Sequence, residues 1–263
     1  MSRLLNNPAG VAAMVARFPR ESREPGISYA TVRDYCQSVD LLPEITGTDG
    51  DLKNVQRPWA LKAVLGCIPP PAHLLEIGGG EPIVSGSLAE LGYDVTLIDP
   101  YDGFGNGPTD YERYVELFPR VKLVREYLGP GIKAFPRNSF DAIFSVSVLE
   151  HLPAESMASC FQAIEEFLRA GGASIHCFDF ILQGRGEIDN RPMAERILAG
   201  QSRLAGAPAP VSLETLLEVL KADVETFYLS PQGHHNWRGG KPYEEFPFRK
   251  VASLQSIAFR PKG

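Results

Sequence analysis

The sequence predicts an α/β fold: a doubly wound, mostly parallel seven-stranded sheet with helices on both faces and a helical N-terminal extension. Two observations predict it. Short apolar runs rich in β-branched residues alternate with segments of helical periodicity, as in a series of βαβ units. One such run, residues 74–77, leads straight into the glycines at 78–80, where a sheet of this kind turns from a strand into a helix.

The apolar runs place the strands and the helical patterns place the helices. Five parallel strands are expected at residues 73–77, 94–98, 121–124, 142–146 and 173–178, and two last strands at 224–229 and 251–259. Helices are expected at residues 11–18, 29–38, 57–65 and 191–204, and Ser212 has the chemistry of an N-cap for one more. A turn-rich string at 46–51 separates an N-terminal helical extension or lid, residues 1–58, from a Rossmann-like domain, residues 59–263.

The composition is that of a globular enzyme, with 263 residues, 44% of them hydrophobic and 22% charged. The net charge is -6 and no run is rich in Lys or Arg, which argues against a nucleic-acid or membrane-surface partner because phosphate neutralisation needs clustered cations. No apolar stretch reaches the ~18 residues of a membrane span, and the cysteines form no C-x-x-C pair. We therefore expect a cytoplasmic protein with a small-molecule substrate, and the sequence leaves its oligomeric state open.

The glycine cluster predicts a nucleotide site. Gly78 and Gly80 have no Cβ, so the chain can turn sharply after the strand and approach a ligand closely. Asp99 ends the next expected strand, where its carboxylate can hold a ribose diol by two hydrogen bonds. The alternative is a purely structural role without a nucleotide, because glycine at a βα turn and Asp as a helix cap occur in any doubly wound fold.

The spacing around the glycines distinguishes between nucleotides. A dinucleotide fingerprint has a third glycine three residues after the second, and Ile83 stands there. The region instead resembles motif I of the class I S-adenosylmethionine-dependent methyltransferases, E/D-x-G-x-G-x-G, with Glu76, Gly78 and Gly80 in its first three fixed places. Pro82 stands where the last glycine is usual, which fixes φ and removes an N–H donor.

The resemblance extends along the middle of the chain. Residues 138–153 look like the family's fourth-strand region, and residues 169–175 look like the helix end, glycine turn and fifth strand that follow it. The match covers roughly residues 59–180. It implies methyl transfer from S-adenosyl-L-methionine to a small molecule, with O-methylation slightly favoured. A nicotinamide-dependent oxidoreductase and a non-catalytic nucleotide-binding protein remain as alternatives.

The resemblance and the topology together name the site residues. In an open α/β sheet, ligands bind beyond the carboxyl ends of the parallel strands. The residues expected to bind the cofactor are Glu76, Gly78, Gly79, Gly80, Asp99, Tyr127, Leu128 and Ser145. Of these, Tyr127 and Leu128 lie at the strand end that forms the adenine slot in the family, although an ordinary core role is equally open to them.

The candidates for catalysis and substrate binding lie at the same edge. His151 follows a strand end and suits a general base that takes a proton from a hydroxyl, although a helix-cap or packing role for the Glu150-His151 pair is the alternative. His176, inside a strand, is expected to be a satisfied core histidine, whereas Asp179 at that strand's exit is the expected substrate contact.

The family's last strand is antiparallel, which would bring the connection at 230–249 over this edge too. It adds His234 and His235 as further candidate bases, and Trp237 and Arg238 as substrate contacts. A solvated loop is the alternative. No metal is expected there, because adjacent histidines of an extended segment point apart.

Overall fold

The computed structural model describes residues 24–103, 107–184 and 190–262. The strands of the described chain are β1 (Gly26–Tyr29), β2 (His73–Ile77), β3 (Asp94–Ile98), β4 (Val121–Val124), β5 (Phe140–Val146), β6 (Leu168–Gly184) and β7 (Arg249–Phe259). The helices are α2 (Val32–Leu41), α3 (Lys53–Cys67), α4 (Ile83–Glu90), α5 (Tyr111–Leu117), the short 3-10 turn η3 (Leu149–His151), α6 (Ala154–Phe167), α7 (Arg191–Ala205), α8 (Leu213–Ala222) and α9 (Pro231–Arg238).

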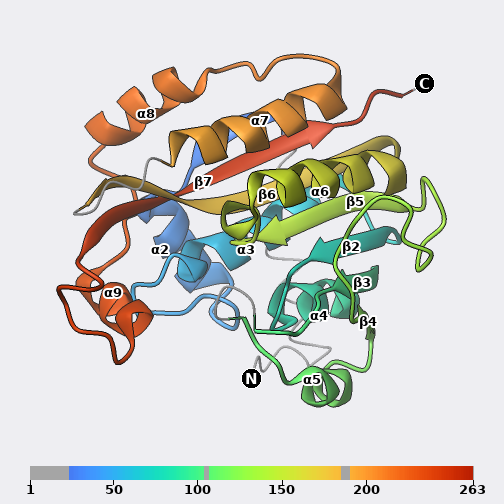
Figure 1. The fold of residues 1–263 in the computed structure, drawn as a ribbon, viewed down its shortest axis with the longest axis horizontal. Helices are drawn as coiled ribbons and strands as arrows, with labels where there is room; N and C mark the ends of the chain where they lie inside the picture. The colour runs from blue at the N-terminus through green and yellow to red at the C-terminus, as the bar shows by residue number, and fades with distance from the viewer. Residues whose placement is uncertain (1–23, 104–106, 185–189, 263) are drawn as a thin grey trace.

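The strands form one seven-stranded sheet in the order β1-β7-β6-β5-β2-β3-β4 (Figure 1). Strands β2 to β6 are parallel to one another, whereas β7 is antiparallel to both β6 and β1. The chain first builds outward from β2 to β4 and then returns to β5 on the other side of β2. The predicted fold class is therefore confirmed, and β2 and β5 flank the switch point at which such sheets bind ligands.

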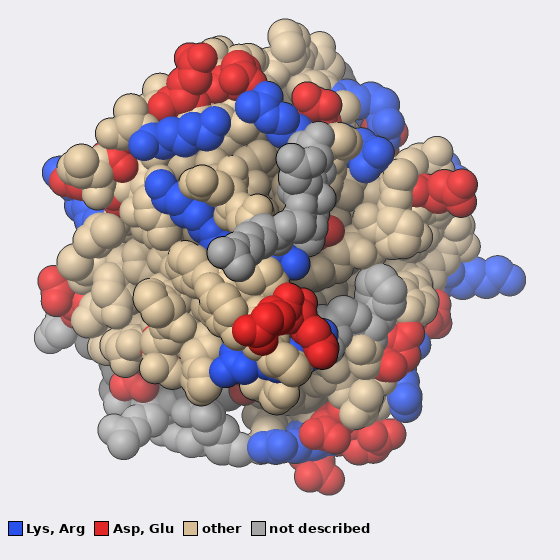
Figure 2. All heavy atoms as spheres, turned by 60° about the vertical axis from the view of Figure 1, so that its left-hand side comes forward, with Lys and Arg blue, Asp and Glu red and all other residues tan. Residues whose placement is uncertain are grey.

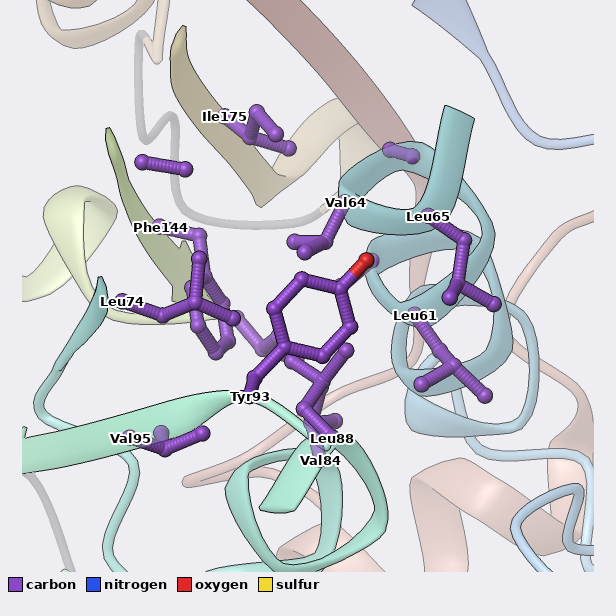
Figure 3. Close-up of a cluster of buried hydrophobic side chains, with 14 of the residues drawn as sticks. Leu61, Val64, Leu65, Leu74, Val84, Leu88, Tyr93, Val95, Phe144 and Ile175 are labelled. Carbon is purple, nitrogen blue, oxygen red and sulfur yellow. The ribbon is translucent and has the colours of Figure 1, made fainter. Parts of the chain in front are cut away.

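Helices cover both faces of this sheet, as predicted (Figure 1). Along β2, Leu74 belongs to the core shared with α3 and α4, and Leu75 belongs to the core shared with α6 and α7, as the two-residue period of a strand requires. Figure 3 shows the first core around the ring of Tyr93, which lies among Leu61, Val64 and Leu88. The Tyr93 hydroxyl donates a hydrogen bond to the carbonyl oxygen of Ile68 at 2.6 Å, so its polar end is satisfied.

The seventh strand is not where the sequence placed it. The prediction of a strand at residues 224–229 is wrong: this segment makes only two isolated bridges, Thr31 to Thr226 and Tyr228 to Ala252. The reason is that β1 already pairs with residues 254–257 of β7 and occupies that edge of the sheet. Tyr29, the first residue of the helix expected at 29–38, is instead the last residue of β1.

Helix α2 begins at Val32 because Thr31 caps it. The Thr31 hydroxyl accepts from the Asp34 N–H, while the Asp34 carboxylate accepts from the Thr31 N–H, which is a capping box. The predicted N-cap Ser212 is confirmed, since its side chain accepts a hydrogen bond from the Thr215 N–H at the start of α8. The expected helix at 11–18 lies outside the described residues.

The predicted division of the chain at residue 58 stays a prediction. Residue 58 lies inside α3, which packs against the sheet, and β1 from the N-terminal segment is part of the sheet itself. None of the described helices combines the length and the apolar character that crossing a membrane requires.

Candidate functional site

A pocket of about 780 Å³ opens at the carboxyl ends of β2, β3 and β5, beside the switch point. Figure 2 turns this side of the molecule toward the viewer and shows Lys and Arg side chains interspersed with Asp and Glu over a largely uncharged surface. Some of the residues that line the pocket were predicted from the sequence and several were not. The predicted ones are Glu76, Gly78, Gly79, Gly80, Asp99, Tyr127, Leu128 and His151.

Glu76 holds the glycine loop against α4. Its carboxylate is buried at the end of β2 and accepts hydrogen bonds from both the backbone N–H and the hydroxyl of Ser85. Burial raises the pKa of Glu76 to about 7, although the two bonds from Ser85 oppose the rise. A Cβ on Gly79 would lie 2.7 Å from the Glu76 carboxyl carbon and 2.6 Å from Leu97, so only glycine fits between strand and carboxylate.

The other two glycines shape the floor of the pocket. Gly78 has a φ of 62° and Gly80 a φ of 53°, in the left-handed region that favours glycine. A Cβ on Gly78 would meet Val148 at 2.7 Å, and Val148 itself lines the pocket. The loop is therefore a close-fitting cradle of backbone. Pro82, the unusual residue of the motif, is the N-cap of α4 and is not among the residues that line the pocket.

Asp99 links the end of β3 to this cradle. One carboxylate oxygen accepts from the Gly80 N–H at 3.1 Å and the other accepts from the Tyr101 N–H at 2.7 Å. Burial raises the pKa of Asp99, while these two bonds oppose the rise. Each oxygen keeps a second lone pair, and the residue lines the pocket, so the carboxylate can still accept two hydroxyl groups.

Tyr127 and Leu128 form the wall after β4. Tyr127 is 58% exposed, its hydroxyl donates a hydrogen bond to the carboxylate of Asp102, and Leu128 is half-buried against the core. Both therefore offer apolar surface to a planar group. Ser145, by contrast, is fully buried outside the pocket lining, where its hydroxyl lies 2.8 Å from Nδ1 of His176.

His176 is the satisfied core histidine that the sequence predicts. Its second ring nitrogen lies 2.8 Å from the hydroxyl of Ser174, and the side chain is completely buried. Burial lowers its pKa to about 3, so the ring is neutral. Ser145 thus satisfies a core histidine, a role that alternation along the strand could not distinguish from cofactor binding.

His151 lies on the pocket wall at the end of η3. Partial loss of hydration lowers its pKa, an effect that Asp179 opposes and Lys53 reinforces. Asp179 itself is not among the residues lining the pocket. Its carboxylate accepts a hydrogen bond from Gln56 Nε2 at 2.8 Å, within the protein.

The connection at 230–249 lies over the same edge of the sheet but does not line this pocket. Part of it is a helix, α9, in which the His234 ring stacks on Phe246 with centroids 5.6 Å apart. The Trp237 indole donates to the Asp51 carboxylate at 2.6 Å, and Arg238 donates to the carbonyl oxygen of Lys241. His235 lies 3.2 Å from Arg238. The contacts of these four side chains are thus with one another or with residues outside the glycine cradle.

Several pocket residues were missed. Lys53 and Arg57 project from α3 one turn apart, and Arg57 lies 3.4 Å from Glu81. Tyr101 closes the cradle by donating its hydroxyl to the Gly80 carbonyl oxygen at 2.9 Å. The only sequence signal was the place of Tyr101 two residues after Asp99. Within the described residues no group of three His, Cys, Asp or Glu side chains is placed to hold a metal ion.

Comparison with known proteins identifies the domain that builds this pocket. Residues 75–176 match a family model described as a methyltransferase domain. This part of the chain matches a methyltransferase domain. It contains the glycine cradle, Asp99, Tyr127, Leu128 and His151, and the match agrees with the resemblance carried by Glu76, Gly78 and Gly80.

The relatives of this methyltransferase domain are distant. Two uncharacterized proteins of Mycobacterium tuberculosis, from strains CDC 1551 and H37Rv, are each 34% identical over 126 residues. The match spans 46% of this chain and 39% of those relatives, so the chain covers well under half of their length.

Solved structures share the fold. The cyclase SpnF has a TM-score of 0.50 at 16% identity, with 90% of this chain and all of that chain covered. A TehB-like SAM-dependent methyltransferase from Corynebacterium glutamicum has a TM-score of 0.48 at 16% identity, with 88% of this chain and 98% of that chain covered.

Proposed function

We propose that this chain is an S-adenosyl-L-methionine-dependent methyltransferase that acts on a small molecule, with a hydroxyl group as the favoured acceptor. The observation that carries the proposal is the joining of Asp99 to the glycine cradle inside a methyltransferase domain. A pocket of about 780 Å³ lies within the range, about 300–1,000 Å³, that small-molecule sites occupy.

The pocket residues fit the parts of this cofactor. Asp99 presents two carboxylate oxygens for the ribose diol, and Tyr127 and Leu128 present apolar surface for the adenine ring. The backbone of the loop at 78–80 leaves room for the methionine end because no Cβ fills it. Lys53 and Arg57 add positive charge to the wall at α3, which suits a carboxylate.

When bound, the cofactor supplies an electrophilic methyl group on a sulfonium. In-line displacement of that kind depends mainly on alignment of the reactants, which can contribute ~7–11 kcal/mol. The chain's part is to orient the two reactants and to exclude water from between them.

A hydroxyl acceptor also needs a base, and His151 is our candidate. Its lowered pKa keeps the imidazole neutral near physiological pH, so its free nitrogen can accept the hydroxyl proton. An amine acceptor in its neutral form needs no base. His234 and His235 remain candidates only if the acceptor reaches beyond this pocket to α9.

Methyl transfer to a panel of small phenols, alcohols, carboxylic acids and amines, with a labelled methyl group on the cofactor, tests the proposal. We expect transfer to at least one hydroxyl compound, and we expect His151→Gln to lower kcat for it by about 100-fold or more, since 100-fold is the lower end of the range for general base catalysis. Transfer only to amines, unaffected by His151→Gln, would overturn the hydroxyl assignment.

The fold alone does not fix the reaction, since a protein described as a cyclase shares it. Cofactor binding without methyl transfer to any acceptor class would favour a non-catalytic or non-methylating role. The panel therefore includes a binding measurement with S-adenosylhomocysteine on the same protein.

A further inference from the structure

The turn that carries His151 is fastened to the sheet by its neighbour Glu150. Oε1 of Glu150 accepts a hydrogen bond from the backbone N–H of Asp179 at 2.9 Å. Glu150 belongs to η3 and Asp179 to β6, so this single bond joins the two elements beside the pocket wall. The position of His151 therefore depends on the Glu150 carboxylate.

Asp179 extends the connection to α3. Its carboxylate accepts a hydrogen bond from Nε2 of Gln56 at 2.8 Å, and Gln56 is completely buried. Lys53, one turn earlier on α3, lines the same pocket as His151. The chain of contacts from α3 through β6 to η3 thus connects the two basic residues of the wall, Lys53 and His151.

The charges around His151 come from these same elements. Asp179 from β6 raises the pKa of His151, and Lys53 from α3 lowers it. Burial raises the pKa of both Glu150 and Asp179 to about 7, and the charge of Glu150 adds to the rise at Asp179. Lys53 lowers the pKa of both carboxyl groups.

Neither carboxyl group lines the pocket. Oε2 of Glu150 is buried and has no hydrogen-bond partner among the described residues, whereas Oε1 accepts the hydrogen bond from the Asp179 N–H. An effect of Glu150 or Asp179 on the reaction must therefore pass through His151 rather than through contact with the substrate.

We propose that Glu150 is a positioning residue for His151, because its carboxylate fastens the turn that carries His151 to the backbone of β6 at Asp179. The inference rests on the proposed function, in which His151 is the base. Asp179, expected as a substrate contact, takes part through its backbone N–H, which anchors Glu150.

Two variants test the hydrogen bond of Glu150. Glu150→Gln keeps an oxygen that accepts from the Asp179 N–H, whereas Glu150→Ala removes it. The matched control is Glu165→Gln on α6, which removes a surface carboxylate about 16 Å along the helix from Ala154.

The experiment is a pH titration of ¹³C- and ¹⁵N-labelled histidine side chains by NMR in the full chain, with His151→Gln used to assign the His151 signals. The His151 ring signals should move in Glu150→Ala and stay in place in Glu150→Gln and in the control Glu165→Gln.

Equal displacements of the His151 signals in Glu150→Gln and Glu150→Ala would overturn the fastening role. If Glu150→Ala fails to fold, displaced His151 signals in Glu150→Gln decide against the inference and retained ones support it. Binding of S-adenosylhomocysteine is measured on the same samples. Its failure in the unmodified protein would contradict the proposed function, while the titration still decides the positioning of His151.

Discussion

The carboxylate of Asp99 accepts a hydrogen bond from the backbone N–H of Gly80, at 3.1 Å. This bond joins the end of β3 to the loop after β2, so the group that would hold the ribose also fixes the loop that would hold the methionine end. The Tyr101 hydroxyl closes the same loop from its other side through the Gly80 carbonyl oxygen. Cofactor affinity and loop conformation are therefore coupled at Asp99.

Asp99→Ala should weaken binding of S-adenosylhomocysteine by at least about 10-fold, because a single hydrogen bond to a charged group contributes about 1.5–3 kcal/mol. Asp99→Asn, which keeps one carbonyl oxygen, should fall between this variant and the unmodified protein. Isothermal titration calorimetry measures the three affinities. The control is Asp40→Ala, an exposed carboxylate on α2 outside the pocket. Equal affinities of Asp99→Ala and Asp40→Ala would exclude the ribose contact.

Gly79→Ala should destabilise the fold by about 1–3 kcal/mol, since its Cβ would overlap both Leu97 and the Glu76 carboxyl group. Gly240 is the matched control, because a Cβ there meets nothing within 4 Å. Urea unfolding of both variants gives the two free energies. A Gly79→Ala protein as stable as Gly240→Ala would show that the strand and Glu76 can move apart.

Glu76 makes the stability depend on pH. Its pKa in the folded chain, about 7, lies above the ordinary value of 4.5, so the folded state retains a proton that the unfolded state has lost between these values. Stability from this group is complete below pH 4.5 and is lost as the pH rises through 7. The pKa values of Glu150 and Asp179 are also raised, so these two groups add to the loss of stability at higher pH.

Glu76→Gln should reduce the loss of folding stability as the pH rises. The raised pKa of Glu76 corresponds to about 3 kcal/mol of unfolding free energy lost between pH 4.5 and about 7. Unfolding free energies at a series of pH values, compared with those of Glu218→Gln, an exposed residue of α8, check this expectation. Parallel curves for Glu76→Gln and Glu218→Gln would mean that Glu76 is ionised in the folded protein.

Trp237→Phe should lower stability by about 0.5–1.5 kcal/mol, because the indole hydrogen bond to Asp51 joins α9 to the turn before α3. Binding of S-adenosylhomocysteine should be unchanged, since Trp237 does not line the pocket. Thermal unfolding and calorimetry on one protein sample measure both quantities. Unchanged stability together with a raised KM for the methyl acceptor would instead support the predicted role of Trp237 as a substrate contact.

The central sheet could be predicted because its strands are short, apolar and bounded by turns. The bounds of β2, β3 and β4 agree with the prediction residue for residue. β1 could not be predicted in the same way. Its four residues lack a strong apolar pattern, and it forms because β7 offers a free edge, which is a property of the assembled sheet.

The site was predictable to the extent that its residues follow strand ends. The glycine cradle and Asp99 are local motifs, whereas Lys53 and Arg57 reach the pocket only because α3 packs across β5 and β6. Ser145 lies one residue before the end of β5, and Asp179 lies within β6 rather than at its exit, because β6 runs on to Gly184. Both side chains make their hydrogen bonds inside the protein, with His176 and Gln56. The position of a residue along its strand predicts that it lies at the ligand-binding edge of the sheet, whereas packing decides whether its side chain reaches the pocket.

The central claim is that this pocket binds an S-adenosyl cofactor. The most direct test is a calorimetric titration of the unmodified chain with S-adenosylhomocysteine and, separately, with NADH, each repeated on Asp99→Ala. The account predicts saturable binding of S-adenosylhomocysteine that weakens in the variant, and no binding of NADH. Binding of NADH without binding of S-adenosylhomocysteine would contradict it.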